Sequence, residues 1–548
     1  MENVLDVWLE SLGTFSEKTK GPSTATDQLM ISQLITAAQL PGYYRFVKAL
    51  GRPEFSQRRR LSEIISALGN CESISHYRLR QDMSYEEFAK AVPLTTYSDW
   101  EPLILEQIQT GTQKICVGTQ RYQPTSGSTA AHKWIPYTKA FMKEMDSAVQ
   151  AWLGDLGFRQ SKALRGAQYW SLSWLPQEQR SNRPSNDDLE LLPGWKRKIL
   201  QKMMAVPASV TFADTMEESQ FATLAYLCSR QDLTLVSVWS PTFWLSLLDR
   251  LTEWQPLLEE TLASGKWAFP KFNSKIQAPK NTYAANILNA LTGESLLKKL
   301  WPALAQISCW DSAGSEIWTK KVRTKHPGIL VQGKGLWATE GVITIPFKDK
   351  FPAAVTSHFL EWIDLESQKV LPTWALRKGQ RVQPVLTGGH GLLRYKLNDS
   401  MEVTGFMDQT PTLEFRGRLR ETDLVGEKMS PQLTIEAFNM VEKKLDAQLM
   451  SLFAVRTLNT QPYYMVLARE NGTDSQKIGE AVEESLSRIF HYKLARELGQ
   501  LGSVRVRVER DPELVYQEIF ERKGMLSGDI KIEPLVEISE EFLQPSSH

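Results

Sequence analysis

Apolar residues recur at spacings of three and four through the first part of the chain, up to about residue 117. Residues 28–40 and 61–68 show this spacing most clearly. Side chains that lie three or four positions apart share one face of an α-helix. The pattern therefore predicts a helical N-terminal region.

Between residues 220 and 262 the pattern changes to short apolar runs that alternate with helical segments. Residues 233–239 resemble a buried strand, and residues 242–250 have helical spacing. The runs at 306–310 and 328–332 repeat the strand pattern, and each leads into a turn that contains glycine. Such alternation is typical of α/β folds with a largely parallel sheet. We expect this architecture for the larger part of the chain.

After about residue 418 the elements follow a different order. The expected elements are a helical stripe (Ile435, Phe438, Val441, Leu445, Leu449), strands at 452–458 and 463–468, a long helix at 475–498, an alternating strand at 503–509 and a final short helix. This series makes a small α+β domain of ordinary size. We expect a large N-terminal domain with parallel and mixed sheets over residues 1–417, a hinge over 418–430 and a C-terminal domain over 431–548.

The charge balance and the cysteines narrow the functional classes. In 548 residues, 64 Lys and Arg face 63 Asp and Glu, for a net charge of +1. A nucleic-acid-binding protein carries a basic excess or stripe, so no nucleic-acid partner is expected. No apolar stretch approaches the roughly 20 residues that span a bilayer, and the acidic first ten residues do not match a secretory signal. The four cysteines form no close pair, so we expect a cytoplasmic protein without a membrane partner.

The sharpest local motif is a hydroxyl-rich glycine turn that is followed by Lys133. Hydroxyls and backbone N–H groups in such a turn form a concave surface for phosphate oxygens, and a lysine adds a compact positive charge. A polar surface turn that caps the next helix has the same composition, so both interpretations stay open for this motif alone. The turn consists of Thr125, Ser126, Gly127, Ser128 and Thr129.

Three further stretches carry candidate chemistry, each with a simpler alternative. Residues 310–316 have small side chains that leave room for a flat base, although a strand-to-helix turn looks the same. Glu340 has the carboxylate that Mg²⁺ prefers, although Thr-Glu also begins helices. Asp399 stands in a polar bend where a carboxylate can accept from ribose hydroxyls, although an Asn-Asp hairpin turn fits as well. Only the order and spacing of all the stretches favour a nucleotide site.

Taken together, these motifs resemble those of the acyl-adenylate-forming superfamily, which includes luciferases, acyl-CoA ligases and adenylation domains. Within it, the chain is similar to the auxin-responsive "Gretchen Hagen" acyl acid–amido synthetases, and the likeness covers nearly the whole chain. The matching stretches are 125–129 with Lys133, 338–340, 357–362, 392–406 and 411–418.

The resemblance implies a two-step reaction. A carboxylic acid and Mg·ATP give acyl-AMP and pyrophosphate, and then an amine, usually an amino acid, attacks the acyl-adenylate to form an amide. The expected cofactors are ATP and Mg²⁺. The resemblance also implies that the small C-terminal domain rotates between the two steps.

The resemblance further implies a role for each matching residue. It places Thr125, Ser126, Gly127, Ser128, Thr129 and Lys133 at the phosphates, Ala313, Gly314 and Ser315 beside adenine, Thr339 at the α-phosphate, Glu340 at Mg²⁺, and Asp399 and Arg418 at the ribose. Lys531 is the candidate that neutralises charge on the reacting carboxylate, with Lys523 as a nearby alternative. The expected catalytic set is thus Lys133, Glu340 and Lys531.

An acyl-binding pocket should be apolar and aromatic. Possible wall residues are Tyr169, Trp170, Trp174, Trp239, Phe243 and Trp337, of which we expect more to lie in the core than in the pocket. Two other functions remain open. An acyl-CoA ligase would share the adenylation step and form a thioester, and a non-catalytic relative would only bind nucleotide or acyl ligand.

Overall fold

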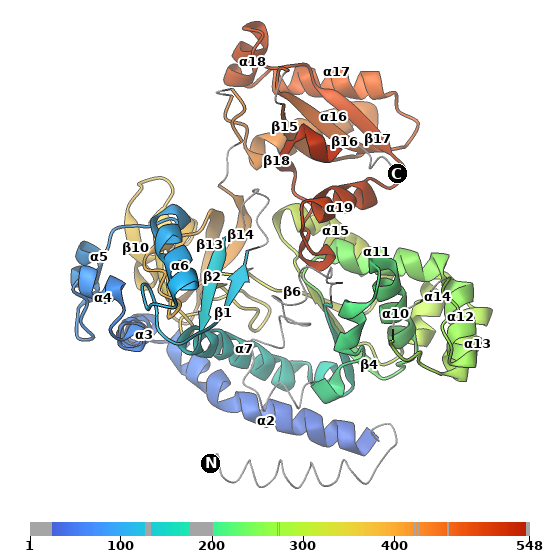
Figure 1. Cartoon of the computed structure of the whole chain (residues 1–548), viewed down its shortest axis with the longest axis horizontal. Coiled ribbons are helices and arrows are strands. Elements are labelled where there is room, and N and C mark those ends of the chain that lie inside the picture. The colour runs from blue at the N-terminus through green and yellow to red at the C-terminus, as the bar shows by residue number, and fades with distance from the viewer. Residues whose placement is uncertain are drawn as a thin grey trace.

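The computed structural model describes residues 25–125, 133–172, 174, 201–270, 272, 275–419, 422–425, 427–457 and 460–543. Figure 1 shows an antiparallel sheet with small helices on one side and a helix-rich part with a parallel sheet on the other. Helices α2 and α7 run below both parts, and the C-terminal elements lie above them. Among the described residues no helix combines the length and the apolar character that a membrane crossing requires.

The N-terminal region is helical, as predicted. Its helices are α2 (Ala25–Leu50), α3 (Pro53–Leu68), α4 (Glu72–His76), α5 (Tyr85–Ala91) and α6 (Tyr97–Thr110). Ser84 caps α5 through the Glu87 N–H, and the Glu87 carboxylate accepts from the Ser84 N–H in return. Such a capping box satisfies two backbone donors that a helix start leaves open.

Helix α2 packs closely against α7 (Lys139–Arg159), and glycines allow this approach. A Cβ at Gly154 would lie 2.6 Å from Tyr43 Cβ. A Cβ at Gly42 would lie 2.4 Å from Gln150 Cβ. Side chains at these two positions would push the helices apart, so the glycines allow α2 and α7 to lie in close contact.

The predicted parallel sheet is confirmed. It has the order β3-β4-β5-β6, with all neighbours parallel. Because the carboxyl ends of parallel strands share one edge, Trp170, Ser237, Cys309 and Gly333 end their strands side by side. The strands are β3 (Ala167–Trp170), β4 (Leu233–Ser237), β5 (Gln306–Cys309) and β6 (Leu330–Gly333). The associated helices are α10 (Met216–Cys228), α11 (Pro241–Glu253), α12 (Gln255–Ser264), α13 (Thr282–Ala290), α14 (Gly293–Leu300) and α15 (Glu316–Lys325).

A second, antiparallel sheet and two short hairpins carry the candidate nucleotide residues. The sheet comprises β9 (Phe359–Asp364), β10 (Val370–Pro372), β11 (Arg381–Thr387), β12 (Tyr395–Lys396), β13 (Asp399–Met407) and β14 (Thr410–Arg418). The hairpins are β1 (Thr119–Pro124) with β2 (Trp134–Thr138), and β7 (Trp337–Ala338) with β8 (Gly341–Val342).

A buried ion pair fastens this sheet to helix α5. Arg394 donates to both carboxylate oxygens of Glu361, at 2.9 and 2.8 Å. The same guanidinium donates to the carbonyls of Ala89 and Val92, at 2.7 and 2.8 Å. Tyr85 adds a third hydrogen bond to Glu361, at 3.1 Å. These bonds fix the segment that continues directly into β12 and β13.

The C-terminal part forms a four-stranded sheet of order β17-β16-β15-β18. Its elements are α16 (Pro431–Leu445), β15 (Leu449–Arg456), β16 (Tyr463–Arg469), α17 (Ser475–Leu486), α18 (Phe490–Glu497), β17 (Arg505–Glu509), α19 (Pro512–Arg522), η6 (Ser527–Asp529) and β18 (Leu535–Ser539). The expected helix over 475–498 is two helices, because Ile489 adopts extended backbone angles between them. Leu449 belongs to β15 instead of α16, and the sequence prediction did not include β18.

We expect Glu361→Ala to lower the free energy of unfolding by about 3–5 kcal/mol, because it leaves the buried Arg394 charge without its carboxylate. Urea unfolding measures this loss. Glu402→Ala is the matched control, since Glu402 pairs with Arg416 on the same sheet in a half-exposed position and should cost less than about 1 kcal/mol. Equal losses in both variants would contradict the importance of the buried pair.

Candidate functional site

The turn between β7 and β8 is held by side chains from three other segments. Tyr137 Oη donates to the carbonyl of Thr339 at 3.1 Å, and His390 Nε2 donates to the carbonyl of Glu340 at 2.9 Å. Tyr395 Oη lies 3.4 Å from Glu340 Oε1 and donates to it. The turn residues Thr339 and Glu340 therefore have fixed positions. The alternative for this stretch, the start of a helix, is wrong, because Thr339 and Glu340 form a turn between two strands.

His390 acts in this turn as a neutral donor. Its Nδ1 accepts the N–H of Leu392 at 3.2 Å, which leaves the proton on Nε2. Burial, together with the nearby His358, lowers the pKa of His390 to about 3. Phe141 stacks on both imidazoles, with ring centroids 4.4 Å from His390 and 5.3 Å from His358. Because His390 also bonds the carbonyl of Glu340, this stack helps to hold the turn in place.

Glu340 is surrounded by both signs of charge. Burial raises the pKa of its carboxyl group, the field of Lys133 lowers it and that of Asp399 raises it. Lys133 lies at the end of the β1–β2 loop. Its carbonyl accepts the N–H of Thr125, at the start of the loop, at 2.9 Å. The structure thus brings Lys133, Glu340 and Asp399 into one electrostatic neighbourhood. Ser126, Gly127, Ser128 and Thr129 lie outside the described residues.

Asp399 and Arg418 face each other at the ends of neighbouring strands. Asp399 begins β13, Arg418 ends β14, and the two are paired in register. Arg418 Nε lies 4.0 Å from Asp399 Oδ1, and its Nη1 lies 3.4 Å from Glu533 Oε1. Burial raises the pKa of the Asp399 carboxyl group, while Arg418 and Lys531 oppose this rise.

Of the two lysines that the sequence left as alternatives, Lys531 lies at this cluster. Its Nζ is 3.4 Å from the ring centroid of Trp310. Burial, and then the like charge of Arg418, lower the pKa of Lys531 to about 8. Lys523 instead lies over the ring of Phe520, at 5.3 Å.

The residues expected beside adenine follow β5. Ala313 has a positive φ of 51° and begins the short helix η4 (Ala313–Ser315), which contains Gly314. This helix contacts β14, the strand that ends in Arg418. The expected adenine residues and the expected ribose residue Arg418 therefore belong to adjoining elements.

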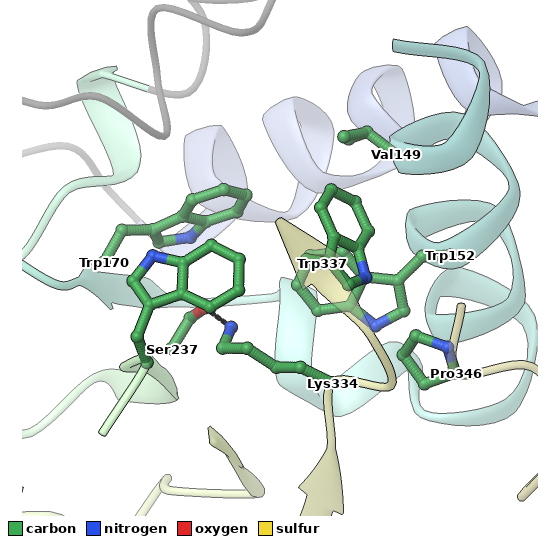
Figure 2. A pocket seen from close by; sticks show the side chains of 8 residues that line it. Val149, Trp152, Trp170, Ser237, Lys334, Trp337 and Pro346 are labelled. Carbon is green, nitrogen blue, oxygen red and sulfur yellow. Dashed lines mark hydrogen bonds between the residues drawn. The ribbon is translucent and has the colours of Figure 1, made fainter. Parts of the chain in front are cut away.

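A cavity lies at the carboxyl edge of the parallel sheet, with about 390 Å³ of empty space, part of it open to solvent (Figure 2). Three expected wall residues, Trp170, Trp239 and Trp337, line it. The full lining is Val149, Trp152, Trp170, Ser237, Trp239, Lys334, Trp337 and Pro346.

The other expected wall residues lie elsewhere. Phe243 is only 5% exposed and lies on the buried face of α11, in the hydrophobic core. Tyr169 is fully buried and packs against Trp244 in the same core. Trp174 donates to the carbonyl of Ala213 at 2.8 Å and is not part of the lining.

Sequence reasoning did not identify Trp152 and Lys334 as lining residues. Trp152 lies on the buried face of a helix, where core and cavity residues look alike. For Lys334 a signal existed, because it follows a predicted strand at its carboxyl end, where ligands bind in α/β folds. A charged residue at that position indicates a binding role.

A dedicated metal cage is absent from the described residues, where no three His, Cys, Asp or Glu side chains form a cluster that could hold an ion. Mg²⁺ does not need such a cage. It usually binds one or two carboxylates and completes its shell with water and phosphate oxygens. The half-buried carboxylate of Glu340 fits this requirement.

Comparisons with known proteins agree with this fold. The profile of the GH3 family N-terminal domain matches residues 42–331, and that of the GH3 family central domain matches residues 351–418. The jasmonoyl–L-amino acid synthetase JAR4 of Nicotiana attenuata is 22% identical over 507 residues, covering 82% of this chain and 85% of that protein. The indole-3-acetic acid-amido synthetase GH3.10 of Arabidopsis thaliana is 23% identical over 244 residues, covering 39% of this chain and 41% of that protein.

A solved structure has the same architecture along almost the entire chain. The AtGH3.15 acyl acid amido synthetase in complex with 2,4-DB superposes with a TM-score of 0.74 and 19% identity, over 96% of each chain. This likeness shows the adenylate-forming fold.

Proposed function

The chain belongs to the GH3 family, and from this premise we propose that it is an ATP-dependent acyl acid–amido synthetase. It adenylates a carboxylic acid, releases pyrophosphate and transfers the acyl group to an amine, in the simplest case an amino acid. One observation carries this proposal. Five charged residues from distant parts of the chain lie close enough to shift one another's pKa values, beside an aromatic cavity. They are Lys133, Glu340, Asp399, Arg418 and Lys531.

The names of the relatives support the amide product. The similar protein from Nicotiana is named a jasmonoyl–L-amino acid synthetase, and the one from Arabidopsis is named an indole-3-acetic acid-amido synthetase. Both names describe an amide product. The solved structure with the same fold is an acyl acid amido synthetase. A thioester product finds no comparable support among these proteins.

In this proposal ATP is the substrate that the charged cluster binds. Asp399 accepts hydrogen bonds from the ribose hydroxyls. Its ionised form accepts them most strongly, and Arg418 and Lys531 favour that form. Thr339 lies at the α-phosphate, and Lys133 with the β1–β2 loop lies at the departing phosphates. Ala313, Gly314 and Ser315 border adenine.

The chemistry needs placement and charge neutralisation more than covalent participation by the protein. A carboxylate oxygen must approach the α-phosphorus in line while negative charge accumulates. Lys531 supplies a positive charge at the acid, and Lys133 supplies one at pyrophosphate. Glu340 would hold Mg²⁺, which neutralises phosphate charge when bound.

The C-terminal domain, which we place at residues 431–548 after a hinge at 418–430, brings Lys531 to the acid. In this position Glu533 pairs with Arg418 at 3.4 Å, and Ser527 Oγ lies 3.3 Å from Met216 Sδ. A rotation between the two steps would break both contacts and withdraw Lys531. We place the enzyme in the cytoplasm, which its four free, buried cysteines support.

The decisive experiment is ATP–pyrophosphate exchange over a set of aryl, indolyl and aliphatic acids. Each acid that supports exchange is then incubated with amino acids or with CoA. Amide formation supports the proposal, and thioester formation alone would replace it with acyl-CoA ligation. Failure of every acid to support exchange would contradict adenylation.

We expect Glu340→Gln to reduce pyrophosphate exchange by at least about 100-fold, because the metal loses its carboxylate ligand at the reacting phosphates. Circular dichroism should be unchanged. Glu294→Gln is the matched control, since Glu294 is an exposed carboxylate that pairs with Lys298. Exchange at the normal rate in Glu340→Gln would remove this residue from the metal site.

The pH profile of adenylation should depend on Lys531. Burial disfavours the charged ammonium, so this lysine loses its proton near pH 8 instead of near 10.5. Its positive charge is present below pH 8 and is lost as the pH rises. We therefore expect kcat/KM for adenylation, which reports the free enzyme, to fall as the pH passes about 8.

Lys531→Arg should move this alkaline decline to higher pH, because a guanidinium stays protonated. Lys523→Arg should leave the profile as it is, since the Lys523 ammonium lies over the ring of Phe520. The same decline in wild type and Lys531→Arg would assign it to another group.

A further inference from the structure

Arg121 is a charged residue of the β1–β2 hairpin for which the adenylation chemistry has no use. Its side chain is half-buried, and two of its guanidinium nitrogens, Nε and Nη2, are withdrawn from solvent. Neither nitrogen has a hydrogen-bond acceptor among the residues that the structure describes. A buried donor without an acceptor destabilises a folded protein, and a charged donor does so most. Arg121 therefore indicates that a ligand supplies the acceptor.

The two nitrogens show which kind of ligand this is. Nε and Nη2 together form the edge of a guanidinium that binds a carboxylate or a phosphate through two parallel hydrogen bonds. The chain itself uses this edge twice. Arg394 donates from it to both oxygens of Glu361, at 2.9 and 2.8 Å. Arg230 donates from it to both oxygens of Asp232, at 2.7 and 2.7 Å. The same edge of Arg121 is suited to an oxyanion.

The hairpin places Arg121 beside the turn that carries Thr339. Arg121 lies directly opposite Tyr137 in the register of β1 and β2, and its guanidinium carbon is 5.1 Å from the ring centroid of Tyr137. The Tyr137 hydroxyl donates to the carbonyl of Thr339 at 3.1 Å. One tyrosine thus contacts both the guanidinium and the residue that the proposed reaction places at the α-phosphate. A ligand of Arg121 would lie near the reacting centre.

The departing phosphates lie at the other end of the hairpin. Lys133 bonds Thr125 there, and the four residues of strand from Arg121 to Thr125 span about 13 Å. In-line displacement puts the attacking carboxylate oxygen and the leaving pyrophosphate on opposite sides of the α-phosphorus. The position of Arg121, beside Thr339 and distant from the loop, favours the acyl side over the pyrophosphate side.

Two carboxylates visit the acyl side in the proposed reaction, first that of the acid and then that of an amino acid that attacks the acyl-adenylate. Lys531 already supplies the positive charge at the acid. We propose that Arg121 binds the α-carboxylate of the acceptor amino acid and so directs its amine toward the acyl carbon. This inference rests on the proposed function, whose acceptor it specifies. Arg121 is a specificity residue and takes no part in the making or breaking of bonds.

The proposal makes the acceptor an amino acid with a free carboxylate instead of a simple amine. An amine without this group would leave both buried donors of Arg121 unpaired. A site built to hydrogen-bond a substrate group rejects analogues that lack it much more strongly than an apolar pocket rejects a missing methylene. Arg121 would therefore select the acceptor without affecting the choice of acyl acid.

The test takes an acid that supports pyrophosphate exchange and offers each common L-amino acid and its primary amide as acceptor. The amide keeps the shape and the side chain of the amino acid and removes the negative charge. For wild type, kcat/KM for amide-bond formation should be at least about tenfold higher with the best amino acid than with its amide. Equal use of the two acceptors would overturn the proposal without any variant.

Arg121→Met should lower the ratio of kcat/KM between the amino acid and its amide by at least about tenfold, because both donors are lost. Pyrophosphate exchange needs no acceptor and should stay within about twofold of wild type. Arg58→Met is the matched control, since Arg58 also lies 5.1 Å from an aromatic ring, that of Trp374, but is exposed and pairs with Glu54. A fall in exchange in Arg121→Met would assign the residue to the nucleotide or the acyl acid and overturn the proposal. So would an equal fall with both acceptors.

If Arg121→Met does not fold, Arg121→Lys serves in its place. Lysine keeps one positive charge but lacks the planar fork, so the same ratio should fall at least about threefold, and an unchanged ratio would overturn the proposal. Absence of exchange with every acid would contradict the proposed function and this inference together. Exchange and amide formation that do not depend on Arg121 would leave the proposed function in place and contradict the inference alone.

Discussion

Charge that is partly withdrawn from water is the constraint on which the site depends. Burial shifts each ionisable group toward its neutral form, raising the pKa of Glu340 and Asp399 and lowering that of Lys531. Opposite charges pull these groups back, with Lys133 acting on Glu340 and Arg418 acting on Asp399. The charged form of each group is therefore stabilised by the charges of the others. A site of this kind is prepared for a ligand that brings several charges of its own.

The fold meets this constraint by joining parts that are themselves rigid. Neutral side chains hold the Glu340 turn, through His390 and the Phe141 stack, so that positioning adds no charge. Farther away, the Glu361–Arg394 pair fixes the segment that leads into Asp399. The charged residues are therefore positioned by contacts that do not compete with a bound nucleotide.

Sequence patterns predicted the parts of this arrangement that depend on local periodicity or on ordered motifs. The parallel sheet follows from short apolar runs that alternate with helical segments, a pattern typical of α/β folds. The pattern could not assign Phe243 to the core and Trp239 to the cavity, because both environments are apolar and helix or strand periodicity shows only burial. The break between α17 and α18 depends on the backbone of Ile489, which no glycine or proline marks. The sequence could show that Lys334 follows a strand, but its burial depends on tertiary packing and could not be predicted from the local pattern.

In the proposed reaction, Trp310 links the two halves of the chemistry. One of its faces meets Lys531 of the C-terminal part, and its ring neighbours Trp239 of the cavity wall. Withdrawal of Lys531 after pyrophosphate departs would uncover Trp310 and open a path to the acyl-adenylate from the side that the C-terminal domain had covered. The amine would then bind at the position that the lysine had occupied. Adenylation and amide formation could therefore not take place at the same time.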